Sequence, residues 1–123
     1  MTTENIQLVR VYDVPEPALE NSFLVDRLWP RGISKVRLTG VPWLKSIAPS
    51  EALRRWVHED PNRWEEFRGR YLAELEQTDG WKPLVELLQQ GAVVTLLFAN
   101  KDTEHNQAVV LRDFLQQKLS VPV

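Results

Sequence analysis

A nearly continuous apolar run near the end of the chain constrains its fold more than any other feature. The segment VVTLLF, residues 93–98, lies between Gly91 and Asn100 and has the length of one strand. A half-exposed strand alternates apolar and polar residues, so an unbroken apolar strand must be covered on both faces, as in a parallel sheet. Helical patterns flank this run, and alternating strands and helices indicate an α/β fold.

Two earlier segments also have the character of strands. Residues 6–12 and 23–28 are rich in β-branched, aromatic and other apolar residues and are bounded by turn-forming residues. Residues 41–47 form a weaker candidate for a short strand, because Pro42 suits a strand start or a sheet edge. These segments extend the expected sheet to three strands or more.

Four segments have helical signals. Ser50 can cap a helix, and Asp60 followed by Pro61 restarts one. A third helix is expected between Gly80 and Gly91, and a fourth from about residue 102 to residue 119. We therefore predict one α/β domain over residues 1–123, with a small, mostly parallel sheet flanked by helices.

The composition excludes several kinds of chemistry. The chain of 123 residues suits one domain, and it contains no cysteine and only two histidines, His58 and His105. We therefore expect no metal site, no thiolate catalysis and no cofactor. Neither a secretory signal pattern nor an apolar run of the roughly 20 residues needed to span a bilayer is visible. A cytoplasmic protein without membrane contact is expected.

Charge is distributed unevenly along the chain. The formal net charge is -2, yet residues 27–70 contain ten Lys or Arg against five Asp or Glu. The rest contains five basic and twelve acidic residues. This asymmetry indicates an anionic ligand for the middle segment. The alternative is that most of these arginines are solvated helix surface paired with nearby glutamates.

Polar side chains follow the second expected strand, in the sequence DRLWPRG. Ligands of open α/β sheets bind beyond the carboxyl ends of the strands. Arg27 and Arg31 could clamp a phosphate or carboxylate, with Asp26 orienting one of them and Trp29 lining the pocket. The alternative is a buried structural pair of Asp26 and Arg27 that fixes the loop.

A second polar segment, NKDTEHN at residues 100–106, follows the apolar strand. If the helix begins near Asp102, its free N–H groups favour an anion. His105 in its first turn could then act as a general base, with Asp102 as a second candidate for proton transfer and Asn106 as a ligand contact. Alternatively, Asp102 or Thr103 only caps the helix, and His105 and Asn106 pack against a neighbouring loop.

Further candidates lie between these segments. Lys45 and Arg54 could bind an anion, and Ser50 could offer its hydroxyl, although a serine after proline at a helix start is more often a cap. His58, at the end of the same helix, is expected to be structural. Trp64 falls at helical spacing with other apolar residues, so it is expected in the core.

The motifs resemble those of the YeaO-like proteins, a branch of a bacterial and archaeal domain family of unknown function. The resemblance covers nearly the whole chain. It rests on the segments VDRLWPRG (25–32), WLK (43–45), APS (48–50), LR (53–54), PNRWEEFRGRY (61–71), VTLL (94–97), KD (101–102) and HN (105–106). This resemblance implies an α/β fold but no agreed activity.

Two functions are weighed from these observations. The chain contains no phosphate-binding loop, dinucleotide fingerprint or nucleophile elbow. The leading hypothesis is a protein that binds a phosphate-bearing or other anionic small molecule, such as a nucleotide, and acts as a hydrolase or transferase if it is an enzyme. The alternative is a nucleic-acid-binding or regulatory module that uses segment 27–70, against which the isoelectric point of about 5.7 argues.

Overall fold

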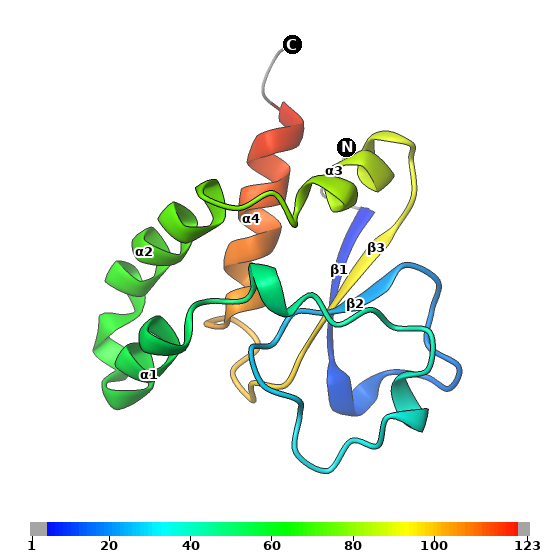
Figure 1. Ribbon diagram of the computed structural model, residues 1–123, viewed down its shortest axis with the longest axis horizontal. Helices are drawn as coiled ribbons and strands as arrows, with labels where there is room; N and C mark the ends of the chain where they lie inside the picture. The colour runs from blue at the N-terminus through cyan, green and yellow to red at the C-terminus, as the bar shows by residue number, and fades with distance from the viewer. Residues whose placement is uncertain (1–4, 121–123) are drawn as a thin grey trace.

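The centre of the fold is β3 (Val94–Phe98), which lies between two parallel neighbours. The computed structural model describes residues 5–120. β1 (Ile6–Arg10) and β2 (Ser22–Leu24) both pair with β3, in the order β1-β3-β2 (Figure 1). Every residue of β3 is buried. The prediction of a parallel strand covered on both faces is confirmed.

The helices begin largely where the capping residues predict. They are α1 (Glu51–Glu59), α2 (Trp64–Glu76), α3 (Lys82–Gln89) and α4 (Gln107–Ser120). The Ser50 hydroxyl accepts a hydrogen bond from the Leu53 N–H at 3.2 Å, and the Asp60 carboxylate accepts one from the Asn62 N–H at 3.0 Å. Both groups satisfy N–H donors that a helix start leaves unpaired. The described part of the chain is a single α/β domain.

The two faces of the sheet are covered by different kinds of structure. The larger core cluster contains Leu96 of β3 together with side chains from all four α-helices. Leu97 points to the opposite face, as alternation along a strand requires, and belongs to a second cluster. In the second cluster, loops and short 3-10 helices pack against the strands β2 and β3. Its buried residues are Val11, Val14, Leu24, Ile33, Leu38 and Leu97.

The prediction of a short strand at residues 41–47 is wrong. Only Trp43 makes an isolated parallel bridge, to Leu24, and Lys45–Ile47 is a 3-10 helix. Two hydrogen bonds hold this segment, from the Leu24 N–H to the Pro42 carbonyl and from the Leu44 N–H to the Leu24 carbonyl. Pro42 has no N–H of its own to extend the ladder.

The first two strands are shorter than predicted. β1 ends at Arg10, and residues 11–13 turn into a 3-10 helix. β2 ends at Leu24, although the Val25 N–H still donates to the Leu97 carbonyl at 3.1 Å. Beyond Val25 the chain leaves the sheet, so Asp26 begins a loop above the end of β3. None of the described helices is long and apolar enough to cross a membrane.

The last helix begins five residues later than predicted. α4 starts at Gln107, and Asn106 caps it by accepting a hydrogen bond from the Val109 N–H at 3.1 Å. Asp102 does not cap a helix. Its Oδ1 accepts the N–H groups of Glu104 and His105, both at 2.9 Å, which closes a local turn. Short polar side chains stabilise such turns in competition with a helix.

Candidate functional site

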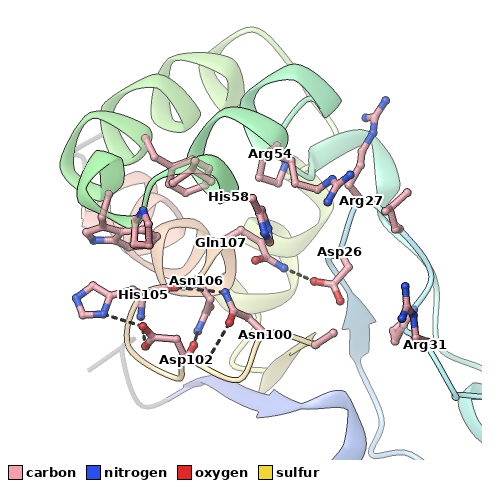
Figure 2. A pocket seen from close by; sticks show the side chains of 18 of the residues that line it. Asp26, Arg27, Arg31, Arg54, His58, Asn100, Asp102, His105, Asn106 and Gln107 are labelled. Carbon is pink, nitrogen blue, oxygen red and sulfur yellow. Dashed lines mark hydrogen bonds and ion pairs between the residues drawn. The ribbon is translucent and has the colours of Figure 1, made fainter.

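A cavity of about 830 Å³ opens beyond the carboxyl ends of β2 and β3. Its walls come from residues 26–31 after β2, residues 99–107 after β3, the α1 helix and the first turns around α2 (Figure 2). This is the edge at which parallel sheets bind their ligands. The volume lies within the range of roughly 300–1,000 Å³ that is usual for small-molecule sites.

The structure brings eight of the ten predicted site residues to this cavity. They are Asp26, Arg27, Trp29, Arg31, Arg54, Asp102, His105 and Asn106. The other two, Lys45 and Ser50, do not line it. Lys45 is exposed and lies over the Trp43 ring, with its Nζ 5.1 Å from the ring centroid. Ser50 caps α1 and donates its hydroxyl to Glu74 Oε2 at 2.6 Å.

Asp26 is the buried acid of the cavity. The residue is only 9% exposed, and its Oδ1 accepts a hydrogen bond from Gln107 Nε2 (Figure 2). Burial raises the pKa of Asp26 to about 6, although hydrogen bonds from Gln107 and from the Ala99 backbone favour the charged form. No ion pair joins Asp26 to Arg27 within residues 5–120. The partner of this carboxylate is an amide.

Three arginines give the cavity its positive charge. Arg54 Nη2 forms an ion pair with Glu51 Oε2 at 3.1 Å, while its Nε is buried without a hydrogen-bond partner. Neither Arg27 nor Arg31 has a carboxylate within ion-pair distance among the residues that the structure describes. Their guanidinium groups therefore keep their hydrogen-bond donors available for another anion.

The arginine-bearing loop is held by hydrogen bonds to its backbone. The Tyr12 hydroxyl donates to the Arg31 carbonyl at 2.8 Å, and Trp29 Nε1 donates to the Ile33 carbonyl at 2.6 Å. The Trp29 ring also meets the Trp43 ring edge to face, at 5.4 Å between centroids. These contacts orient Trp29 against the loop, and it lines the cavity as predicted.

On the opposite wall, Asp102 and His105 form an exposed pair. His105 Nδ1 lies 3.1 Å from Asp102 Oδ2, and the His105 ring meets the Trp64 ring edge to face. The N–H groups of Glu104 and His105 lower the pKa of Asp102. The expectation that His105 lies in the first turn of a helix is wrong, because α4 begins only at Gln107.

Asn106 has a structural task at this wall. It is almost fully buried, its Oδ1 caps α4, and its Nδ2 donates to the Asp102 carbonyl at 2.8 Å. Both ends of the amide are therefore occupied by backbone groups. Asn106 therefore has a structural role, although the cap is Asn106 itself and not Asp102 or Thr103 as the alternative prediction had it.

Sequence reasoning missed several residues of the cavity. Gln107 is the first residue of α4 and could have been found from its position after β3. His58 was expected to be structural, yet it lines the cavity from α1. Trp64 packs against the core as predicted, stacks on Phe67 and lines the cavity as well. No group of metal-ligating side chains occurs in the part of the chain that the structure describes.

Comparisons with known proteins place this chain in a family. A family model described as the inactive DUF488-N3 subclade matches residues 5–122. The uncharacterised protein YeaO of Escherichia coli is 42% identical over 112 residues, which cover 91% of this chain and 97% of YeaO. Uncharacterised proteins of Mycobacterium bovis and Mycobacterium tuberculosis are 36% identical over 110 residues, 89% of this chain and 92% of each relative. No solved structure matches. The chain therefore belongs to the inactive DUF488-N3 subclade, together with the YeaO-like proteins it resembles.

Proposed function

We propose that this protein binds a phosphate-bearing or other anionic small molecule in the cavity at the carboxyl ends of β2 and β3. The observation that carries the proposal is the pair of arginines, Arg27 and Arg31, on one loop of the cavity without carboxylate partners among the described residues. A guanidinium group can donate two parallel hydrogen bonds to a phosphate or carboxylate. Arg54 adds a third cation from α1.

Binding without turnover is the form of this proposal that the observations support best. The family description includes the word inactive. Asp102 and His105 remain the exposed candidates for proton transfer, with Asp26 as the buried one. However, Asp102 already holds two backbone N–H groups and the His105 ring, which suits a structural role in the loop. A hydrolase or transferase activity is therefore the weaker extension of the proposal.

The charges of segment 27–70 support nucleic-acid binding less well than they support binding of a small anion. All four arginines of α1 and α2 have a carboxylate partner. Arg55 pairs with Glu51, Arg70 with Glu66, and Arg68 with Asp113. Such pairs neutralise the positive surface that phosphate backbones require. Two cations without such partners, Arg27 and Arg31, line a concave cavity that suits a small ligand. Lys35, Arg37 and Lys45 also form no ion pair among the described residues, but they lie outside the cavity.

Two neighbouring arginines on α1 allow a matched test. Arg54 lines the cavity, whereas the Arg55 side chain is 71% exposed and pairs with Glu51. With AMP, glucose 6-phosphate and pyrophosphate as probes, we expect Arg54→Ala and Arg31→Ala to weaken binding about tenfold or more, because each loses a hydrogen bond to a charged group. Arg55→Ala should bind like the parent. Isothermal titration calorimetry measures these affinities.

Two outcomes would count against the proposal. Equal losses in Arg54→Ala and Arg55→Ala would indicate a diffuse charge effect instead of a site. No binding of the three probes, combined with binding to duplex DNA or RNA that falls steeply with salt, would favour the nucleic-acid alternative. Unchanged melting temperatures of the variants serve as the folding control.

We also propose a cytoplasmic location, because nucleotides and sugar phosphates are abundant there. Fractionation of cells that express the protein at its natural level tests this location. Recovery of the protein with the membrane or the secreted fraction would contradict it.

A further inference from the structure

One oxygen of the Asp26 carboxylate has no partner. Oδ2 is buried and makes no hydrogen bond within the described residues, whereas Oδ1 is held by Gln107. The residue as a whole is 9% exposed and belongs to the cavity wall. Leaving a buried acceptor unpaired is costly, and more so when the acceptor is charged. The free-energy cost of an unpaired Oδ2 indicates that another group binds this oxygen when the protein functions.

The chemistry of Oδ2 defines what could meet it. With a pKa raised to about 6, Asp26 is largely ionised at neutral pH, so Oδ2 accepts hydrogen bonds. No described side chain donates to Oδ2: Gln107 is engaged at Oδ1, and no arginine or lysine forms an ion pair with Asp26 in the described structure. The Ala99 backbone N–H favours the charged carboxylate but makes no hydrogen bond to Oδ2. The missing partner is an N–H or O–H group brought by a ligand.

The other residues of the cavity narrow the chemical class of this ligand. Arg27, Arg31 and Arg54 supply cations on the same walls, and Figure 2 shows Asp26 between the arginine loop and Gln107. The aromatic rings of Trp29 and Trp64 line the same cavity and offer apolar faces for a ring. A ligand that satisfies these groups is a ring that carries both a donor and a phosphate.

Building on the proposed anion binding, we infer that Asp26 Oδ2 accepts a hydrogen bond from an amino group of the ligand, which makes the ligand an amino-substituted phosphate. Two sources have this chemistry: a nucleotide whose base carries an exocyclic amino group, and an amino-sugar phosphate. In both, the arginines hold the phosphate and Asp26 selects the amino group. Asp26 is thus the specificity-determining residue of the cavity.

Two matched pairs of ligands test this inference. AMP and purine riboside 5′-monophosphate differ only in the exocyclic amino group, and glucosamine 6-phosphate and glucose 6-phosphate differ in an amino group that replaces a hydroxyl. Affinities are measured by calorimetry on the full chain and on Asp26→Asn. In at least one pair we expect the amino ligand to bind about tenfold or more tightly. AMP gains one hydrogen bond to a charged acceptor, whereas the ammonium of glucosamine 6-phosphate forms a charge-assisted hydrogen bond where the hydroxyl of glucose 6-phosphate is a neutral donor. The pair that shows the difference identifies the source.

In Asp26→Asn this preference should disappear, because Nδ2 would oppose the ligand's N–H with a second donor, while the phosphate remains bound by the arginines. If this variant fails to fold, Asp26→Ala provides the same comparison. Binding of all four ligands without any amino preference would overturn the inference and leave the proposed anion site intact. A preference that survives in the variant would overturn it as well. Absence of binding by all four would overturn both proposals.

Discussion

Among the described carboxyl groups, Asp26 is the one whose pKa burial clearly raises. Burial separates its carboxylate from water, and Gln107 together with the Ala99 backbone offsets only part of the cost. The pKa rises from 3.8 to about 6, so the folded protein holds the proton more tightly than the unfolded chain does. Asp26 therefore lowers stability as the pH rises through the interval between these two values, and the loss is complete above it.

This environment makes a prediction about pH. Asp26→Asn removes the buried charge, so we expect it to be more stable than the parent at pH 8, by up to about 3 kcal/mol for a shift of roughly two pKa units. Near pH 4, where the parent carboxyl is protonated in the fold, most of this gain should vanish. Urea unfolding at both values measures the difference. Asp79→Asn, at an exposed position, is the control, and an equal effect of Asp26→Asn at both pH values would contradict the burial argument.

At the scale of elements, the residue that caps α4 could not be predicted from the sequence. Asp102, Thr103 and Asn106 are all good capping residues, and local sequence does not rank them. The structure selects Asn106, which is buried, while the Asp102 carboxylate closes its own turn. By contrast, Ser50 caps α1 as predicted, and Asp60 caps the 3-10 helix Pro61–Arg63 that leads into α2. Each of these caps has little local competition.

The position of this cap can be tested. Asn106→Ala removes the acceptor of the Val109 N–H and the donor to the Asp102 carbonyl, so we expect a loss of about 1–2 kcal/mol in the free energy of unfolding. Thr103→Ala, which alters one of the two capping residues expected from the sequence, should cost much less. Thermal or urea unfolding compares the two variants. A larger loss for Thr103→Ala would mean that the helix extends further toward β3.

At the scale of the whole molecule, the sheet is covered by helices on one face and by loops on the other. Leu96 and Leu97 are neighbours in β3, both fully buried, in different core clusters. We expect Leu96→Ala and Leu97→Ala each to destabilise the protein by about 2–5 kcal/mol, the usual cost of such a cavity. Urea unfolding measures both. A small effect of Leu97→Ala, close to that of a change at exposed Val93, would mean that the loop layer packs poorly.

The assembly of the site was only partly predictable from the sequence. The rule that ligands bind at the carboxyl ends of parallel strands selected residues 26–31 and the loop after β3, and residues of both segments line the cavity. It did not indicate that His58 faces the same space, because the placement of α1 over the sheet end depends on packing between distant helices. Lys45 looked as suitable as Arg54, but the 3-10 helix Lys45–Ile47 leaves it beside Trp43, away from the cavity.

The cavity joins residues from opposite halves of the chain, with Arg27 and Arg31 on one wall and Asn106 and Gln107 on another. A molecule bound between them stabilises the folded state, because it can bind only when both halves of the chain are folded and adjacent. Each tenfold rise in its concentration above the dissociation constant would then add about 1.4 kcal/mol to the free energy of unfolding. In the cell, the supply of this molecule would set how long the protein survives proteolysis.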